Sequence, residues 1–446
     1  MSGSDGDAAE KSWNWITFSA VAACFGPYLV GGFRSEQIVF YVLGFGTFAM
    51  VWVKRRYVSR RSPVVLMVLW VGMATVAAVA TVSGVSFRVR GQYAFSLQEL
   101  DNWVMPLASL TLAWSLAQLY RSRDLVTTFA YSLILFVAAN ACLQIAQLLQ
   151  GPGGPIKGFL GHFWSSTAAG VPDSRGFLSV GQRVYLSERL TGIINQPAEA
   201  GILYALGLVI TVWAYRSGMI KLWTFVVMSS LTVIGGLLTL SKAFILMGIP
   251  FALVLLLVGA KLRQQLGVLA GTTLMVGLAW SAFVRGEWSR AEGLLDWLIG
   301  LTSIGGATGG RISVNGGFYD AVTVEVLSRS PIIGFGLDPH SHTDGESARV
   351  IASSGLLGLI LLLAFYGAMI QRALAARFEL ETQTWILSIA VVGIIIGGGV
   401  GVPTFSANRV GSLLLLILGL LLFTGPQRLA QRAGRALLRR RKVPEM

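Results

Sequence analysis

The sequence predicts an all-α polytopic membrane protein. The chain has 446 residues, of which 54% are hydrophobic and 13% are charged, and its mean hydropathy is +0.67. Ordinary soluble domains carry about 25% charged residues, so this composition excludes a water-soluble globular domain and a disordered chain. The apolar residues form continuous runs of about 20, the length that crosses a bilayer core as a helix. Because the runs do not alternate as barrel strands do, they predict transmembrane helices.

The runs predict about 12 spans, all within a single integral membrane domain that covers residues 1–446. The first span follows an acidic N-terminal stretch, the opposite of the basic start of a signal peptide, so no cleaved leader is expected. The predicted spans, in chain order, are residues 13–32, 36–53, 64–84, 103–120, 125–150, 192–215, 220–239, 241–260, 266–284, 347–370, 384–402 and 411–424.

Short basic connections orient these spans, because loops rich in Lys and Arg stay in the cytoplasm. If the spans alternate, one side receives all the basic connections and the basic C-terminal tail at residues 425–446, so both termini are predicted to be cytoplasmic. That side holds 21 of the 35 Lys and Arg and 7 of the 21 Asp and Glu, and 21 − 7 equals the whole net charge of +14. The basic pI therefore reflects topology and does not indicate nucleic acid.

The same alternation places two long loops on the external side, at residues 151–191 and 285–346. Long loops are usually functional or disordered, and the aromatic residues and all three histidines in these two make disorder a poor description. The second loop is predicted to contain short helices. One is an interfacial helix at residues 286–300, and another is capped by Ser313 or Asn315 and stops before Pro331.

Ionisable and polar residues at the membrane edge are candidates for function, because they are costly to place there. Span six opens with Arg189, and Asn195 and Glu199 follow one helical turn apart on a common face. Span eight opens with Ser241 and Lys242 in an otherwise apolar stretch, where an ammonium needs a water-filled cavity or an anion. The alternative for Arg189 and Lys242 is snorkelling to the headgroups, and Glu199 could equally lie in the headgroup layer.

The large loop carries further candidates. Arg311 follows a glycine pair, and His340, His342 and Asp344 gather just before span ten. A histidine there could act as a general base, because its ordinary pKa of about 6.5 suits proton transfer near neutrality. A hydrogen-bonded structural histidine and a zinc ligand are the alternatives, but no third ligand follows at a familiar zinc spacing, so no metal site is predicted.

Taken together, these segments resemble the bacterial O-antigen ligase and polymerase superfamily. The resemblance covers most of the chain in its layout of spans and its dominant external loop, and three local matches support it. Residues 189–201 are similar to the family's Arg, Gly, Pro motif, and Ser241 with Lys242 is similar to its Ser-Arg pair. Pro331, with Gly334 and Gly336 ahead of a GLLGL run, matches its loop-to-helix signature. Lys242 departs from the usual Arg, which keeps the charge but loses a bidentate fork.

The resemblance implies a glycosyltransferase of the inner membrane that needs no cofactor or metal and works on the external face. Its donor would be a polyprenyl-pyrophosphate-linked oligosaccharide, with Arg189, Arg311 and Lys242 binding the pyrophosphate and Asn195, Glu199 and Ser241 as further substrate contacts. Ligases commonly carry a His-Asn pair eleven residues before the closing glycine, whereas Asp344 stands eleven before Gly355 here. That favours a polymerase and leaves the base open between Asp344 and the two histidines, His342 and His340.

Two other functions remain alternatives. A ligase would transfer the glycan to a lipid or protein acceptor, and a transporter or flippase would move lipid-linked sugars across the membrane. The clustering of charges at the outer edge, rather than along span interiors, favours an enzyme. An acceptor glycan or lipid is the second substrate, and a separate chain-length regulator is an additional candidate partner. The basic tail is expected to rest on anionic headgroups.

Overall fold

The computed structural model describes residues 15–29, 34–54, 62–86, 97–119, 123–150, 155–161, 163, 189–194, 196–258, 318–337, 345–405 and 409–423. Every regular element in these ranges is a helix, and the one β-type pairing is an isolated bridge between Tyr28 and Arg34. The all-helical class predicted from the sequence is therefore confirmed. A short unlabelled helix at residues 15–23 precedes the labelled elements.

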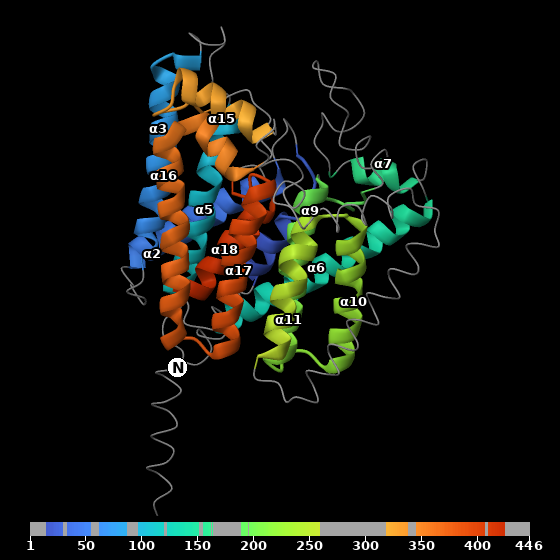
Figure 1. The fold of residues 1–446 in the computed structure, drawn as a ribbon. Coiled ribbons are helices and arrows are strands. Elements are labelled where there is room, and N and C mark those ends of the chain that lie inside the picture. The colour runs from blue at the N-terminus through green and yellow to red at the C-terminus, as the bar shows by residue number, and fades with distance from the viewer. Residues whose placement is uncertain are drawn as a thin grey trace, which may run out of the picture.

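The labelled elements are drawn in Figure 1. They are α2 (Ser35–Lys54), α3 (Val64–Val82), α5 (Leu97–Leu119), α6 (Arg123–Gln150), α7 (Pro155–Gly161), α9 (Pro197–Arg216), α10 (Leu222–Leu238), the π-helix η3 (Phe244–Gly248), α11 (Ile249–Leu257), α15 (Phe318–Arg329), α16 (Glu346–Ala375), the 3-10 helix η4 (Ala376–Phe378), α17 (Thr382–Gly401) and α18 (Arg409–Phe423).

Six helices among the described residues are long and apolar enough to cross a membrane. They lie at Ser35–Val53, Val64–Val82, Leu125–Gln150, Pro197–Arg216, Glu346–Phe378 and Thr382–Gly401. Shorter apolar helices occupy Leu222–Leu238, Phe244–Leu257 and Arg409–Phe423. In the first predicted span, 13–32, the helix ends at residue 23 and turns follow. The predicted span at 266–284 lies outside the described residues, so the total of about 12 stays a prediction.

Helices α9 and α18 form the centre of the molecule. Every residue of α9 from Glu199 to Ala214 is buried, and so is every residue of α18. Figure 1 shows α2, α3 and α16 on one side of this centre and α6 and α10 on the other. A helix that is apolar all round belongs either in a core or in lipid, and both cases occur here.

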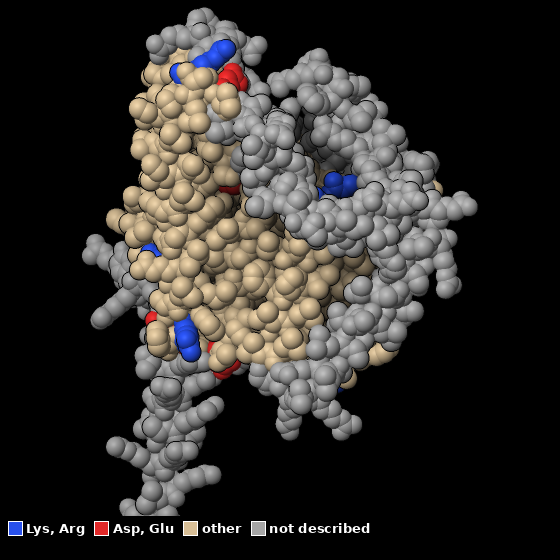
Figure 2. Space-filling view, viewed as in Figure 1, with Lys and Arg blue, Asp and Glu red and all other residues tan. Residues whose placement is uncertain are grey.

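The outer helices carry large apolar side chains on their exposed faces. Those that are more than half exposed include Val42, Phe45, Trp52, Val68, Ile360 and Leu363. Figure 2 shows one face of the molecule, on which the described surface consists mostly of residues other than Lys, Arg, Asp and Glu. Soluble proteins do not expose apolar faces of this extent, so the helices are built to face lipid.

Close approach of helices depends on glycine at two positions of α17. A Cβ at Gly393 would meet the ring of Phe251, and one at Gly397 would meet the side chain of Met247. Spacing of these glycines by four residues predicts such packing, and the contact with η3 and α11 confirms it.

Helix α16 is interrupted at Gly355, where φ is 63° and ψ is −157°. The loop that follows α15 pairs with the interruption. Phe335 and Gly336 donate their N–H groups to Ala352 and Ser353, and Leu356 donates to Pro331. The loop and helix backbones approach so closely that a Cβ at Gly334 would lie 2.6 Å from the Gly355 nitrogen.

This pairing makes the first segment of α16, residues 346–354, a separate buried piece. Ser354 donates its hydroxyl to the Met73 carbonyl in α3, and Leu337 donates its N–H to Thr81 Oγ1 in the same helix. Helix α15 stops before Pro331, as the sequence predicts. The proline and glycines of this sequence motif thus lie where α16 is interrupted at Gly355.

Candidate functional site

The segment at residues 189–194 enters helix α9 and is held by side-chain amides of α6. Leu190 to Ile194 are buried without forming a helix, so their backbone groups need partners. Asn140, Gln144 and Gln147 provide them, at a spacing of four and three residues that places all three on one face of α6.

Each α6 amide contacts a different part of the segment. Gln144 Nε2 donates to the Leu190 carbonyl at 2.9 Å, and Gln147 Oε1 accepts the Gly192 N–H at 3.2 Å. Asn140 Oδ1 accepts the Ile193 N–H at 2.9 Å, while Nδ2 of the same side chain donates to Thr191 O and to the Tyr204 hydroxyl. Gly192 has a φ of +62°, and a Cβ there would strike Asn140.

Arg189 caps the C-terminal end of α10. Its Nε donates to the Thr239 carbonyl at 3.1 Å and its Nη2 to the Leu240 carbonyl at 3.3 Å, while the Leu190 N–H donates to the Leu238 carbonyl at 3.0 Å. Three successive carbonyls at the end of a helix are thus satisfied by two residues, which is favourable because helix ends leave carbonyls unpaired and negative.

The turn after α10 is tight and leads directly to the predicted cation. Leu240 has a φ of +48°, a left-handed conformation that is unfavourable for residues with a Cβ. Ser241 is buried against Gly201 in α9, where a Cβ would collide with the serine side chain. Lys242 is half-buried at the start of the helical run that continues through η3.

The structure therefore brings Arg189, Ser241 and Lys242 together, although the first lies about fifty residues before the other two. Lys242 stands at the N-terminal end of the next helix, and its positive charge and that of Arg189 favour an anion there.

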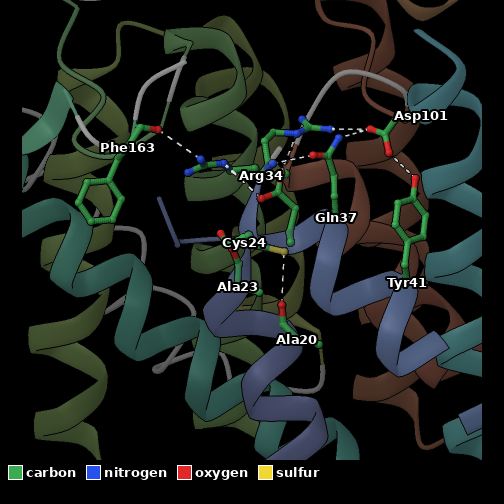
Figure 3. Close-up of polar contacts among 11 residues, drawn as sticks. Ala20, Ala23, Cys24, Arg34, Gln37, Tyr41, Asp101 and Phe163 are labelled. Atoms are coloured by element: carbon green, nitrogen blue, oxygen red, sulfur yellow. Dashed lines mark hydrogen bonds and ion pairs between the residues drawn. The ribbon is translucent and has the colours of Figure 1, made fainter. Parts of the chain in front are cut away.

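A second group of charged residues is buried at the same end of the bundle. Arg34 Nε lies 3.1 Å from Glu36 Oε1, and Arg34 Nη2 lies 3.5 Å from Asp101 Oδ2. Gln37 and Tyr41 of α2 both donate to the carboxylate of Asp101 (Figure 3). Burial alone would lower the pKa of Arg34, but Glu36, followed by Tyr28 and Asp101, raises it above its ordinary value. The guanidinium is therefore charged.

Arg409 joins α18 to this group. Its Nε lies 3.6 Å from Glu36 Oε2, and its Nη2 donates to the Phe163 carbonyl, which is labelled in Figure 3. The guanidinium carbon stands 5.1 Å from the centre of the Tyr28 ring, within reach of a cation–π contact. The side chain is 1% exposed, so its charge is balanced by these neighbours rather than by water.

Glu199 is the first acidic residue of α9 and points toward the same group. Its carboxylate accepts the backbone N–H of Val410, and Arg409, Arg34 and Glu36 are the charged groups around it. One of its oxygens, Oε1, is buried without a hydrogen-bond partner. Pro197 occupies the first turn of α9, where the absence of its N–H costs nothing.

The first segment of α16 adds a further ion pair. Glu346 Oε1 lies 3.7 Å from Arg349 Nη1, and Glu346 Oε2 accepts the Phe405 N–H at 2.9 Å. The Arg349 guanidinium stands 4.8 Å from the centre of the Trp103 ring in α5. Contacts between named residues therefore tie together the N-terminal ends of α2, α5, α9, α16 and α18.

The predicted site residues divide into two sets. Arg189, Glu199, Ser241 and Lys242 lie where they can be described, and Glu199 is buried beside the ion pairs. The remaining candidates, Asn195, Arg311, His340, His342 and Asp344, lie outside the described residues. The described part of the chain holds no cluster of three His, Cys, Asp or Glu residues suited to a metal.

Sequence reasoning missed the α6 amides and most of the buried ion pairs. Asn140, Gln144 and Gln147 could have been found, because polar residues that recur on one face of an apolar span are costly unless they have partners. Arg34 and Arg409 stand in the short gaps between predicted spans on the predicted external side. The sequence around such a residue does not indicate which distant residue it pairs with.

Comparison with models of known protein families finds no match for this chain, and comparison with curated proteins finds no relative.

Proposed function

We propose that this chain is a polysaccharide polymerase that joins polyprenyl-pyrophosphate-linked repeat units on the external face of the bacterial inner membrane. The observation that carries the proposal is the meeting of Arg189, Ser241 and Lys242 at one end of the helical bundle. Two cations at the edge of a membrane-embedded structure suit a substrate whose anionic pyrophosphate sits at the headgroup level and whose tail is apolar.

The chemistry follows from the donor. The oxygen of an acceptor sugar hydroxyl bonds to the anomeric carbon of the donor glycan, and the bond from that carbon to the pyrophosphate oxygen breaks. Attack from the opposite face inverts the anomeric centre, and the leaving group departs as polyprenyl pyrophosphate. The hydroxyl proton passes to a base, for which Asp344 or His342 is the candidate and His340 the alternative.

The cations would act mainly on the leaving group. Pyrophosphate gains negative charge as the bond breaks, and prearranged positive groups stabilise that charge most in a site from which water is excluded. Arg189, Lys242 and Arg311 are the proposed ligands, with Asn195 as a further contact. Ser241 and Glu199 are buried, Ser241 against Gly201 and Glu199 against the Val410 N–H. Exposed apolar side chains on the surrounding helices supply a surface for the polyprenyl tail.

A ligase that transfers the glycan to a lipid or protein is the nearest alternative, because it would use the same pyrophosphate site. A transporter is less well supported. It calls for charges along the interior of several spans, whereas the described buried charges lie at or next to the N-terminal ends of helices. They are Arg34, Glu36, Glu199, Glu346, Arg349 and Arg409.

The experiment that tests the proposal is deletion of the gene followed by separation of the surface glycans by size. A polymerase predicts products reduced to a single repeat unit. Accumulation of lipid-linked polymer would instead identify a ligase, and accumulation of single lipid-linked repeats on the cytoplasmic side would identify a flippase. Unchanged glycans would reject all three.

A further inference from the structure

The α6 amides act on the candidate anion site through a continuous chain of contacts. Gln144 and Gln147 hold Leu190 and Gly192. Leu190 and its neighbour Arg189 in turn hold the last three carbonyls before Ser241. The position of the turn that presents Lys242 therefore depends on side chains in another helix.

This dependence is expected to be strong because the connected backbone is not self-supporting. Residues 189–194 form no helix, and the turn contains Leu240 at a positive φ. A non-glycine residue in that conformation stores roughly 1–3 kcal/mol of strain and persists only when its surroundings fix it. Arg189 supplies two of the three hydrogen bonds that residues 189 and 190 make to this turn.

We infer that Gln144 and Gln147 are positioning residues of the candidate anion site, acting through Arg189 on the turn that carries Lys242. The inference deepens the proposed function and rests on it for the identity of the anion, a pyrophosphate. Within it, Arg189 fixes the turn while Lys242 presents its ammonium. Neither glutamine contacts the substrate.

Substitutions at Gln147 give a matched pair. Gln147→Glu, assayed at acidic pH where a buried carboxyl is protonated and neutral, keeps an oxygen at the Oε1 position that accepts the Gly192 N–H, whereas Gln147→Met has a similar length and no acceptor. Gln144→Met removes the donor to Leu190 O. Gln383→Met is the control, because Gln383 Nε2 also donates to a backbone carbonyl, that of Val258, at the other end of α11.

Two measurements on purified full-length protein test whether Gln144 and Gln147 position the candidate anion site. The first is hydrogen exchange at residues 189–194 and 239–242. The second is binding of inorganic pyrophosphate, with the KM and kcat of glycosyl transfer measured alongside it. Gln144→Met and Gln147→Met should speed exchange in both stretches and weaken pyrophosphate binding about tenfold, the effect of losing roughly 1.4 kcal/mol. Gln147→Glu should restore both, and Gln383→Met should change neither.

The inference is overturned if the methionine variants speed exchange only in residues 189–194 and leave both the turn and pyrophosphate binding unchanged. It is also overturned if Gln147→Glu behaves like Gln147→Met. Failure of the proposed function gives a different result. Wild-type protein would then transfer no glycan, while the coupling of exchange between the two stretches would still appear.

Discussion

Arg409 and Glu36 form an ion pair in which neither side chain is more than 1% exposed, with 3.6 Å between Nε and Oε2. The pair joins the first residue of α18 to the first turn of α2, at opposite ends of the sequence. Glu36 is shared with Arg34, and Arg34 also reaches Asp101 in α5. One buried carboxylate therefore stands between two guanidinium groups and helps to hold three helices together.

Replacing Arg409 with Met should destabilise the protein by about 3–5 kcal/mol, because removal of one partner leaves Glu36 with an incompletely balanced buried charge. The measurement is the thermal unfolding midpoint in detergent. Arg377→Met is the control, since Arg377 is exposed and its guanidinium lies over the ring of Trp385. If both variants melt at the wild-type temperature, the pair contributes nothing to stability.

Glu36 and Glu199, the two acidic residues near Arg409, should differ in how much their substitution destabilises the protein. Glu36→Gln removes a charge paired with two arginines and should cost about 3–5 kcal/mol. Glu199→Gln keeps the oxygen that accepts the Val410 N–H, and no ion pair to Glu199 is resolved, so it should cost about 1 kcal/mol or less. Denaturant titration of the two variants side by side tests the order. Equal losses would show that Glu199 carries a charge as important as that of Glu36.

Gly355→Ala should destabilise the protein by at least about 1–3 kcal/mol, because φ is +63° there and a Cβ would lie 2.5 Å from the Ile332 carbonyl carbon. Gly367→Ala in the same helix should be neutral or stabilising by about 0.5–1 kcal/mol, since a Cβ there meets nothing within 4 Å. Melting temperatures of the two alanine variants provide the comparison. A harmless Gly355→Ala would mean that α16 is not interrupted as described.

Substitutions at Lys242 should separate the effect of its charge on glycosyl transfer from the effect of its shape. Lys242→Gln should reduce kcat/KM for glycosyl transfer by about tenfold or more, as expected when one charged contact to a developing anion is removed. Lys242→Arg keeps the charge and adds a planar fork that suits phosphate, so it should retain activity or raise it. Steady-state kinetics with a synthetic lipid-linked donor provide the test. Full activity in Lys242→Gln would remove this residue from the anion site.

The helical class could be predicted from the sequence because apolar runs of this length have few other structures open to them. The residues at which single helices end were harder to predict, as the first predicted span, 13–32, shows. Residues 24–29 are mostly apolar, yet the helix stops at residue 23 and Cys24 is buried in a turn, because Gly26 and Pro27 favour a turn within the apolar run. Hydropathy measures the free energy of transferring a residue out of water, and it does not show whether the backbone continues as a helix.

Part of the site was also predictable. Ser241 and Lys242 interrupt an apolar stretch and Arg189 stands at the edge of another, which identifies them as candidates without saying that they meet. The pairing of Arg409 with Glu36 could not be predicted, since nothing in either local sequence specifies a partner so distant. The interruption of α16 was hidden for another reason. Gly355 lies in a run that fits a continuous helix, and only the approach of the loop at Gly334 explains the break.

The most direct test of the central claim is glycosyl transfer by the purified protein, supplied with a polyprenyl-pyrophosphate-linked oligosaccharide as both donor and acceptor. The account predicts lipid-linked products lengthened by whole repeat units, release of polyprenyl pyrophosphate, and loss of both in Arg311→Ala protein that is made and inserted at the wild-type level. If wild-type protein leaves the substrate unchanged, or if Arg311→Ala yields products of wild-type length, the proposed function is contradicted.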